Sequence, residues 1–374
     1  RCGGDVAGDL LPATSVLIAG DTERLVLRDC QIDGHDGVAF LSASNTGAML
    51  ARNTIRSRPH GSYTGLALRG LTDSVVVENR IEDGGANLTI DLTPSRGSHE
   101  LAADQRIPPA SVARNVLANN VLLGGGHGPT PSAPPRPQAA TAYWKGQPKA
   151  CDDTTLTVDG EPFWTGISDS YVVVTGGRGV GQYRRVISNT ANTVTVSPAW
   201  EVALDATSQV VIDGCVAENL WLNQRDERSG PWDYLRSMSV GNLVAGLDLR
   251  GGGTLDLVQT GRPAGGPLAY NRLSNCSVDR GAIRLVGARV VGNVLAGVEV
   301  RADSADSAIT VESASQPAEP GLGAAWNLLD RCAVRGARFG IQVRGAVSHL
   351  VLHGNRIAAA ERPLADETGQ VVQR

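Results

Sequence analysis

Acidic and arginine side chains recur in short segments in which Gly or Ala is followed by apolar residues at alternate positions. In an extended strand the alternating apolar side chains point inward, and the residues between them point outward. This pattern predicts that Asp248 and Glu299 both point outward. Two carboxylates on one surface can act as general acid and general base. Asp248 and Glu299 are therefore the candidate catalytic pair.

The same alternation predicts further outward charges, which we expect to form one charged stripe on one sheet and to bind substrate. These residues are Arg69, Asp91, Arg250, Arg284, Arg301 and Arg344. Arg forms paired hydrogen bonds with carboxylate or sulfate groups, so the stripe would suit an anionic ligand. The alternative is a solvated face on which acids and arginines pair across strands, at about 0.2–1 kcal/mol per pair.

Loops supply the remaining candidates. His60 could act as a base and Tyr63 as a proton donor in a β-elimination. Trp232 lies in a long polar loop, where an exposed aromatic ring can stack on a sugar. Several carboxylates that meet at one point could bind Ca²⁺, although the sequence firmly indicates no cofactor or metal. The carboxylates in question are Asp226, Glu227, Asp233 and Asp248. A lone His such as His60 is more often an ordinary surface residue, and Trp232 could equally pack its loop against the flank of the solenoid.

These side chains must be positioned by a repeated element. An apolar–x–Asn/Cys–x–apolar motif returns along the chain, and its spacing is 23 residues from Cys30 to Asn53, 26 from Asn53 to Asn79 and 23 from Cys332 to Asn355. Short alternating apolar runs indicate strands, and no segment holds a helical period for long. One such repeat cannot bury its own apolar face, whereas stacked coils can. The sequence therefore predicts a solenoid of short strands.

The coil motif, followed by Gly–apolar–x–apolar, resembles the right-handed parallel β-helix of the pectate-lyase-like superfamily over about residues 20–125 and 210–360. The resemblance implies an all-β solenoid in which Asn side chains stack in a ladder at one tight turn. It also implies that the outward sheet binds a polysaccharide and that homo-oligomers, often trimers, form. Neither Lys145 nor Lys149 lies in a coil, so the Lys base of pectate-lyase-like enzymes is missing.

A Pro-rich stretch at 125–140 interrupts the coils. Strand-like runs at 156–158, 171–175, 183–188 and 193–197 then predict a small antiparallel β-barrel or β-sandwich insert. The predicted organisation is N-terminal coils over 1–136, the insert over 137–213 and C-terminal coils over 214–374. The Gly-rich run at 177–182 is expected to be a hairpin loop, because a phosphate loop would be followed by a helix and not by a strand.

Two disulfides are candidates among the six cysteines: Cys151–Cys215, which would clamp the ends of the insert, and Cys2–Cys30. Either would indicate an oxidising compartment. Cys276 and Cys332 are separated by one coil, which puts their Cα atoms about 10 Å apart, beyond the reach of a disulfide.

Composition narrows the class of protein. The net charge of −4 over 374 residues argues against a generic nucleic-acid binder. No apolar run approaches the ~18 residues that span a bilayer. The chain opens on Arg1, which suggests a mature or trimmed product.

The leading hypothesis is an extracellular or cell-surface carbohydrate-active β-helix protein, a lyase or hydrolase of an acidic polysaccharide. The alternative is a non-catalytic adhesin, tailspike-like or structural β-helix protein.

Overall fold

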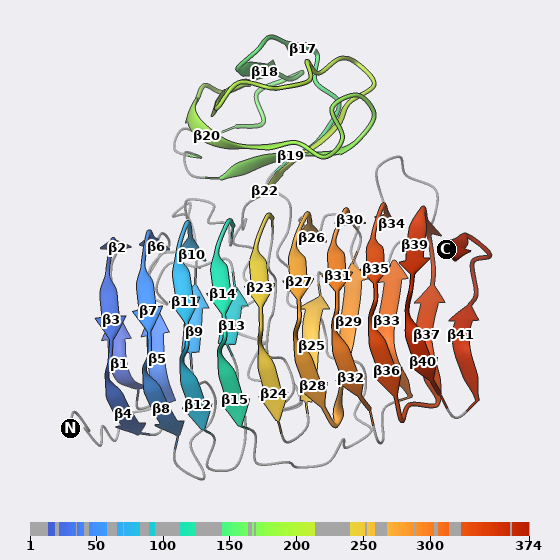
Figure 1. The fold of residues 1–374 in the computed structure, drawn as a ribbon. Helices are drawn as coiled ribbons and strands as arrows, with labels where there is room; N and C mark the ends of the chain where they lie inside the picture. Colours follow the sequence, from blue (N-terminus) through green and yellow to red (C-terminus); the bar gives the residue numbers. More distant parts are fainter. Residues whose placement is uncertain are drawn as a thin grey trace, which may run out of the picture.

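A computed structural model describes most of the chain. The described residues are 14–18, 22–34, 36–40, 45–57, 66–69, 71–82, 90–93, 113–123, 144–163, 167, 170–213, 240–250, 253–258, 268–287, 289–302, 306–313, 323–359 and 361–373. Within these ranges the chain forms strands β1 to β42 and no helix. Most strands stack side by side in a parallel β-helix, and a separate curled sheet lies over one edge of it (Figure 1). The predicted all-β solenoid with a β insert is confirmed.

The first side of the solenoid is a ten-stranded parallel sheet, to which successive coils contribute one strand each. Its strands are β3 (Val26–Arg28), β7 (Met49–Ala51), β11 (Val75–Val77), β14 (Val116–Ala118), β23 (Leu243–Ala245), β27 (Arg272–Ser274), β31 (Val294–Ala296), β35 (Leu328–Asp330), β39 (Leu350–His353) and β42 (Val371–Gln373).

The second side is a nine-stranded parallel sheet, which the chain enters directly after a tight turn. Its strands are β4 (Gln31–Gly34), β8 (Thr54–Ser57), β12 (Arg80–Glu82), β15 (Val121–Leu123), β24 (Asp248–Arg250), β28 (Ser277–Asp279), β32 (Glu299–Arg301), β36 (Ala333–Arg335) and β40 (Arg356–Ala358).

The third side is split into two parallel sheets, before and after the insert. The first holds β1 (Thr14–Ile18), β5 (Asp36–Phe40), β9 (Leu66–Arg69) and β13 (Ile90–Thr93). The second, called the five-stranded sheet below, holds β25 (Gly253–Val258), β29 (Gly281–Gly287), β33 (Ser307–Ser313), β37 (Phe339–Arg344) and β41 (Arg362–Asp366).

Short strands form a narrow corner between the third side and the ten-stranded sheet. They are β2 (Thr22–Glu23), β6 (Asn45–Thr46), β10 (Leu71–Thr72), β26 (Leu268–Ala269), β30 (Arg289–Val291), β34 (Gly323–Ala325) and β38 (Val347–Ser348). Isolated bridges at Ala113 and Val240 connect β10 to β26, so this corner is continuous along the solenoid.

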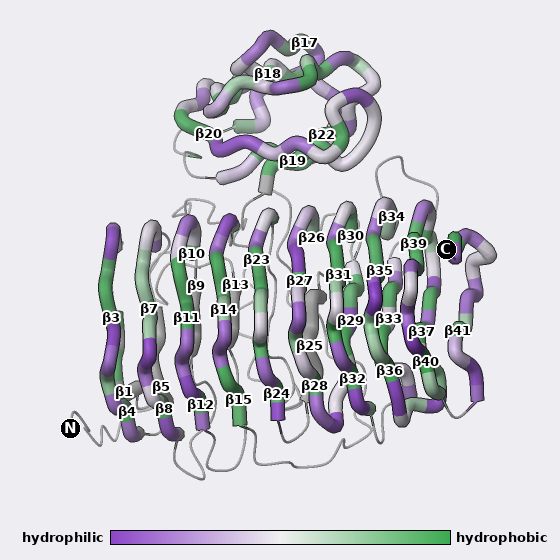
Figure 2. Tube along the Cα trace, in the orientation of Figure 1, coloured by the Kyte–Doolittle hydropathy of each residue, from purple (hydrophilic) through white to green (hydrophobic). Residues whose placement is uncertain are grey.

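Alternation of hydropathy builds the core, because each strand sends every second side chain inward. Figure 2 shows hydrophobic and hydrophilic residues following one another along the strands. One cluster of buried residues runs through the solenoid from Ile32 to Leu352, and it includes Leu117, Leu249 and Ile283. A coil too small to bury its own residues is thus stabilised by the coils on either side of it.

Two asparagine ladders run along the solenoid, where the sequence predicted one. The first, at the entrance to the ten-stranded sheet, consists of Asn115, Asn242, Asn271, Asn293 and Asn327, each linked to the next through its side-chain amide. The second, at the entrance to the nine-stranded sheet, links Asn53, Asn79 and Asn120. The single motif of the sequence combined these two turns, because an Asn before an apolar strand marks both.

Along the solenoid axis, the side chains at the second ladder change from amides to apolar groups and thiols. After Asn120 the same turn position holds Leu247, Cys276, Val298 and Cys332, and it returns to an amide at Asn355. Cys276 and Cys332 are buried free thiols with one coil between them, as predicted. Burial raises the pKa of the Cys332 thiol to about 11, so this group is an inert core residue.

Each ladder position follows a residue with a left-handed backbone. This residue is Gly at Gly241 and Gly292, but Tyr270 (φ 56°) and Trp326 (φ 60°) occupy the same place in other coils. A left-handed residue turns the chain sharply, which lets two sheets meet at a corner of two residues, the left-handed residue and the ladder residue that follows it. Its side chain is carried on the outside of the corner, and Trp326 is accordingly 54% exposed.

The insert is a seven-stranded antiparallel sheet with its own core, centred on Val172, Val194 and Ile212. Its strands are β16 (Trp144–Gly146), β17 (Ala150–Cys151), β18 (Thr155–Thr157), β19 (Tyr171–Gly176), β20 (Tyr183–Asn189), β21 (Thr193–Ser197) and β22 (Gln209–Asp213). The Gly-rich run joins β19 to β20, which pair antiparallel, so the predicted hairpin loop is confirmed. The coils on either side of the insert pair directly, β14 with β23 and β15 with β24.

The insert rests on the corner strands (Figure 1). Tyr171 and Val173 of β19 pack against Ala113, Val240 and Ala269 of the solenoid. The Tyr270 hydroxyl donates to the Val174 carbonyl at 2.6 Å and accepts from the Gly181 amide at 2.8 Å. Its ring stacks on Tyr183 with centroids 6.0 Å apart. The insert is therefore seated on the solenoid by both apolar and polar contacts.

Neither predicted disulfide is formed. Cys30 and Cys151 are free thiols, and the other two cysteines of those predictions, Cys2 and Cys215, lie outside the described residues. The thiol of Cys30 contacts the Arg28 carbonyl at 3.2 Å. The structure therefore supplies no disulfide evidence for an oxidising compartment.

Candidate functional site

The predicted charged stripe does not lie on one sheet. Asp248, Arg250, Glu299 and Arg301 belong to the nine-stranded sheet, whereas Arg284 and Arg344 belong to the five-stranded sheet. Arg69 and Asp91 belong to the sheet of β1, β5, β9 and β13. The prediction of one stripe was wrong because Gly–apolar–x–apolar occurs in two structural contexts. Gly246 and Gly297 are left-handed turn residues before the nine-stranded sheet, whereas Gly340 lies within β37.

The outer face of the nine-stranded sheet carries charges that pair across strands. Arg56 lies 2.7 Å from Glu82, and Arg80 also bonds that carboxylate. Farther along, Arg301 lies 3.0 Å from Asp279. Such exposed pairs contribute about 0.2–1 kcal/mol each and hold the long side chains flat on the sheet. In these coils the face is a solvated surface of paired charges.

Asp248 is held on both oxygens. Its Oδ2 accepts from Arg250 Nε at 2.7 Å, and its Oδ1 accepts from Ser277 Oγ at 2.7 Å. Burial acts to raise the pKa of Asp248, but the hydrogen bonds from Arg250 and Ser277 outweigh it and leave the pKa below its usual value. Asp248 is therefore a carboxylate at neutral pH, which suits a base and not an acid.

Glu299 lies in the same outward column as Asp248, with Ser277 between them. Two strand spacings put their Cα atoms about 10 Å apart, and the direction of the two side chains sets the distance between their carboxyl groups. The Glu299 side chain is exposed. The column therefore holds two carboxylates on one open face, and their catalytic role stays a prediction.

Arginines without a carboxylate partner gather at the C-terminal end of this face. Arg335 of β36 and Arg356 of β40 point outward on adjacent strands, and neither has an ion pair with any residue in the described ranges. Ala333 and Ala358 occupy the outward positions beside them. Arg301 precedes Arg335 in the same column. Small residues between arginines leave the guanidinium groups open to an anion.

The sequence analysis missed Arg335 and Arg356, although a signal was present. It took outward positions only from the Gly–apolar–x–apolar segments. Strands of the nine-stranded sheet also follow the Asn or Cys position directly, as in Cys332–Ala–Val334–Arg335 and Asn355–Arg356–Ile357–Ala358. The residues on either side of Val334 and Ile357 are therefore the outward ones.

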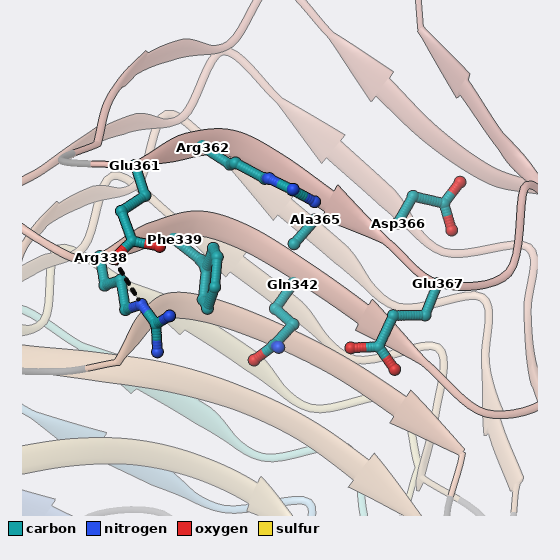
Figure 3. Close-up of a pocket in the computed structure, with 8 residues that line it drawn as sticks. All are labelled: Arg338, Phe339, Gln342, Glu361, Arg362, Ala365, Asp366 and Glu367. Atoms are coloured by element: carbon teal, nitrogen blue, oxygen red, sulfur yellow. Dashed lines mark ion pairs between the residues drawn. The ribbon is translucent and has the colours of Figure 1, made fainter.

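A shallow pocket of about 260 Å³ lies around the corner, on the outer face of β37 and β41 (Figure 3). It is lined by Arg338, Phe339, Gln342, Glu361, Arg362, Ala365, Asp366 and Glu367. The three residues after Arg335 lead directly into it, and the Glu361 amide, just before β41, donates to the Arg338 carbonyl at 3.0 Å. The pocket and the Arg335–Arg356 surface are therefore neighbours.

Most charges of the pocket are paired. Arg338 lies 2.8 Å from Glu361 and 4.8 Å above the Phe339 ring. Arg344, a predicted binding residue, lies 3.2 Å from Glu367. Gln342 is only 4% exposed. Arg362 has no ion pair within the described part of the chain, and its side chain extends over the pocket (Figure 3).

Other predicted residues cannot be placed. His60, Tyr63 and Trp232 lie outside the described residues, as do the candidate calcium ligands Asp226, Glu227 and Asp233. Arg69 and Asp91 are placed only as positions in β9 and β13. The described residues contain no group of three or more His, Cys, Asp or Glu side chains that could hold a metal ion. None of the described segments is a helix long and apolar enough to cross a membrane.

Comparison with known proteins gives only distant similarity. No protein-family model matches the chain, and no curated protein matches its sequence. Two solved structures are similar over most of this chain. The tailspike protein gp49 from Pseudomonas phage LKA1 matches 83% of it at 14% identity with a TM-score of 0.22. The Pseudomonas phage phi297 tailspike gp61 matches 85% of it at 11% identity with a TM-score of 0.24. The matches span 44% and 43% of those tailspike chains, and similarity this low carries no information about function.

Proposed function

We propose that this chain is a β-helix protein of an extracellular or cell-surface setting that binds an acidic polysaccharide through its C-terminal coils. The observation that carries the proposal is the contrast along the nine-stranded face. Arg56, Arg80 and Arg250 each have a carboxylate partner, whereas Arg335 and Arg356 have none in the described ranges. Their guanidinium groups are available to carboxylates or sulfates of a ligand.

The repeat of the solenoid suits a repeating ligand. Arg301, Arg335 and Arg356 lie on three successive strands, which are about 4.8 Å apart. A linear polysaccharide presents its acidic groups at regular intervals, so one chain can contact several coils at once. The adjoining pocket, with Phe339 and Arg362, offers a place for one sugar ring.

We expect an Arg335→Ala/Arg356→Ala double variant to bind pectate, alginate or chondroitin sulfate roughly tenfold more weakly than the unmodified protein. The measurement is titration calorimetry at low and moderate salt, with neutral dextran as the uncharged probe. The affinity should fall as salt rises, because exposed charges are screened.

The matched control is Arg80→Ala, on the same sheet. Arg80 shares Glu82 with Arg56, so its loss leaves Glu82 paired and removes one exposed guanidinium. This variant should bind like the unmodified protein. Equal loss in both variants would mean that net charge alone attracts the polysaccharide, and no binding to any acidic probe would refute the proposal.

Cleavage of the bound polysaccharide is the finer part of the proposal. Hydrolysis would use Asp248 as base and Glu299 as acid, whereas elimination would use His60 and Tyr63. We expect Asp248→Asn and Glu299→Gln each to lower the release of reducing ends at least 100-fold while leaving affinity within about twofold. Release of unsaturated products, followed by ultraviolet absorbance, would assign elimination. Neither product appearing would leave a binding protein without catalysis.

A further inference from the structure

The outer face of the ten-stranded sheet is apolar, in contrast to the charged nine-stranded face. One outward column, called the ridge, contains Met49, Val75, Val116, Leu243, Val294 and Leu328, and Arg272 lies in it between Leu243 and Val294. Val26 and Val372 continue it at the two ends and are 55% and 43% exposed. Arg272 is the one charged side chain among these seven ridge positions, and soluble proteins rarely leave apolar side chains on so many successive strands open to water.

A second outward column, called the groove, runs beside the ridge and consists mainly of small residues. Its members are Ala51, Val77, Ala118, Ala245, Ser274 and Ala296. Ala51 and Ala296 point outward yet are only 2% and 7% exposed, and the ridge side chains beside them are larger. The face therefore has a raised side and a sunken side along its length.

We propose that two copies of this chain pack side by side through this face, with their solenoid axes parallel. A two-fold axis parallel to the solenoid axis places the ridge of each copy over the groove of the other and matches the coils level by level. A two-fold axis in the interface plane but perpendicular to the solenoid axis would instead place the ridge of one copy against the ridge of the other. Only another solenoid repeats its side chains at the same strand spacing of about 4.8 Å over so many levels, so the fitting partner is a second copy.

The size and composition of the face fit a stable interface. Nine strand spacings of about 4.8 Å and a width of about five extended residues give roughly 700 Å² per copy, close to the roughly 800 Å² of a standard interface. Charged pairs border the apolar centre, among them Arg52 with Asp29 at 2.7 Å and His353 with Asp330 at 2.7 Å. An apolar centre within a polar rim is the usual anatomy of an interface. No described strand lies over the ten strands (Figure 1).

The test is the mass of the full chain in solution. At micromolar concentration we expect the unmodified protein to sediment as a dimer and Val116→Glu to sediment as a monomer, with at least a ~100-fold weaker association. The matched control is Val121→Glu, a half-buried outward valine of the same coil that lies on the nine-stranded sheet. This variant should remain a dimer. Circular dichroism and melting temperature check that both variants are folded.

Cysteine cross-linking tests the orientation. Val116→Cys protein mixed with Ala118→Cys protein should form a disulfide between copies, because ridge and groove meet at the same level. Mixtures of unmodified protein with each variant control for the native thiols. A monomeric unmodified protein, a dimer that survives Val116→Glu, or cross-linking of Val116→Cys to Val294→Cys in its place would overturn the proposal. Polysaccharide binding uses a different sheet, so its outcome is independent of these results.

Discussion

Asn271→Ala is expected to lower the free energy of unfolding by about 2–4 kcal/mol. The Asn271 side chain accepts from the backbone and side-chain amides of Asn242 at 3.0 and 2.9 Å, and it donates to Asn293 at 3.0 Å. Asn271 is fully buried, so water cannot replace these bonds. Alanine would remove the acceptor of the buried Asn242 backbone amide, and the Asn242 side-chain amide would keep the Val240 carbonyl at 3.3 Å. The measurement is the shift of the denaturant midpoint.

The control for this prediction comes from the other turn column, where Cys276 fills the equivalent buried position with an apolar side chain. Cys276→Ala removes buried volume but breaks no hydrogen bond between side-chain amides. It should therefore lower the free energy of unfolding by only about 1 kcal/mol. Equal losses in the two variants would show that the amide ladder contributes only packing.

Tyr270→Phe is expected to loosen the insert on the solenoid. The change removes one hydroxyl, which leaves the Val174 carbonyl and the Gly181 amide without the contacts of 2.6 and 2.8 Å. We expect a loss of about 2–3 kcal/mol in docking and therefore roughly 30-fold or more faster hydrogen exchange at Gly181. The stacking of Tyr183 on the ring is retained by Phe, so the effect reports the hydroxyl alone.

Trp326→Phe is the matched control for Tyr270→Phe. Trp326 has the same left-handed position two coils farther along, but it stacks on His349 with ring centroids 3.9 Å apart. Exchange within the insert should therefore be unchanged in this variant. Unchanged exchange in Tyr270→Phe as well would mean that the apolar contacts of Tyr171 and Val173 alone seat the insert.

The sequence was sufficient for the solenoid and for the strands of the insert. Alternation of apolar residues and the recurrence of Asn53, Asn79 and Asn355 depend on neighbours only a few residues apart, so they are visible in a linear sequence. The insert strands near 156, 171, 183 and 193 were predicted for the same reason and agree with the structure to within one or two residues. The repeat alone also placed Cys276 and Cys332 one coil apart, too far for a disulfide, and both are free thiols.

The number of ladders and the arrangement of the charged face required the tertiary structure. Asp248 and Arg284 lie in similar local motifs but on different sides of the solenoid, because the side is decided by the corner that precedes each strand. Some of these arginines pair within their own strand, as Arg250 does with Asp248, but Arg56 and Arg301 find their carboxylates on the neighbouring coil. Arg335 and Arg356 therefore became candidates only when the register of β36 and β40 was known.

The local alternation of this chain thus determined that it forms stacked coils with an apolar interior, because each strand buries every second residue whatever its neighbours are. Only the tertiary structure decided which outward residues share a face. Register and corner geometry set the charged nine-stranded face and the apolar ten-stranded face side by side, and both arise from contacts between coils that no local pattern encodes.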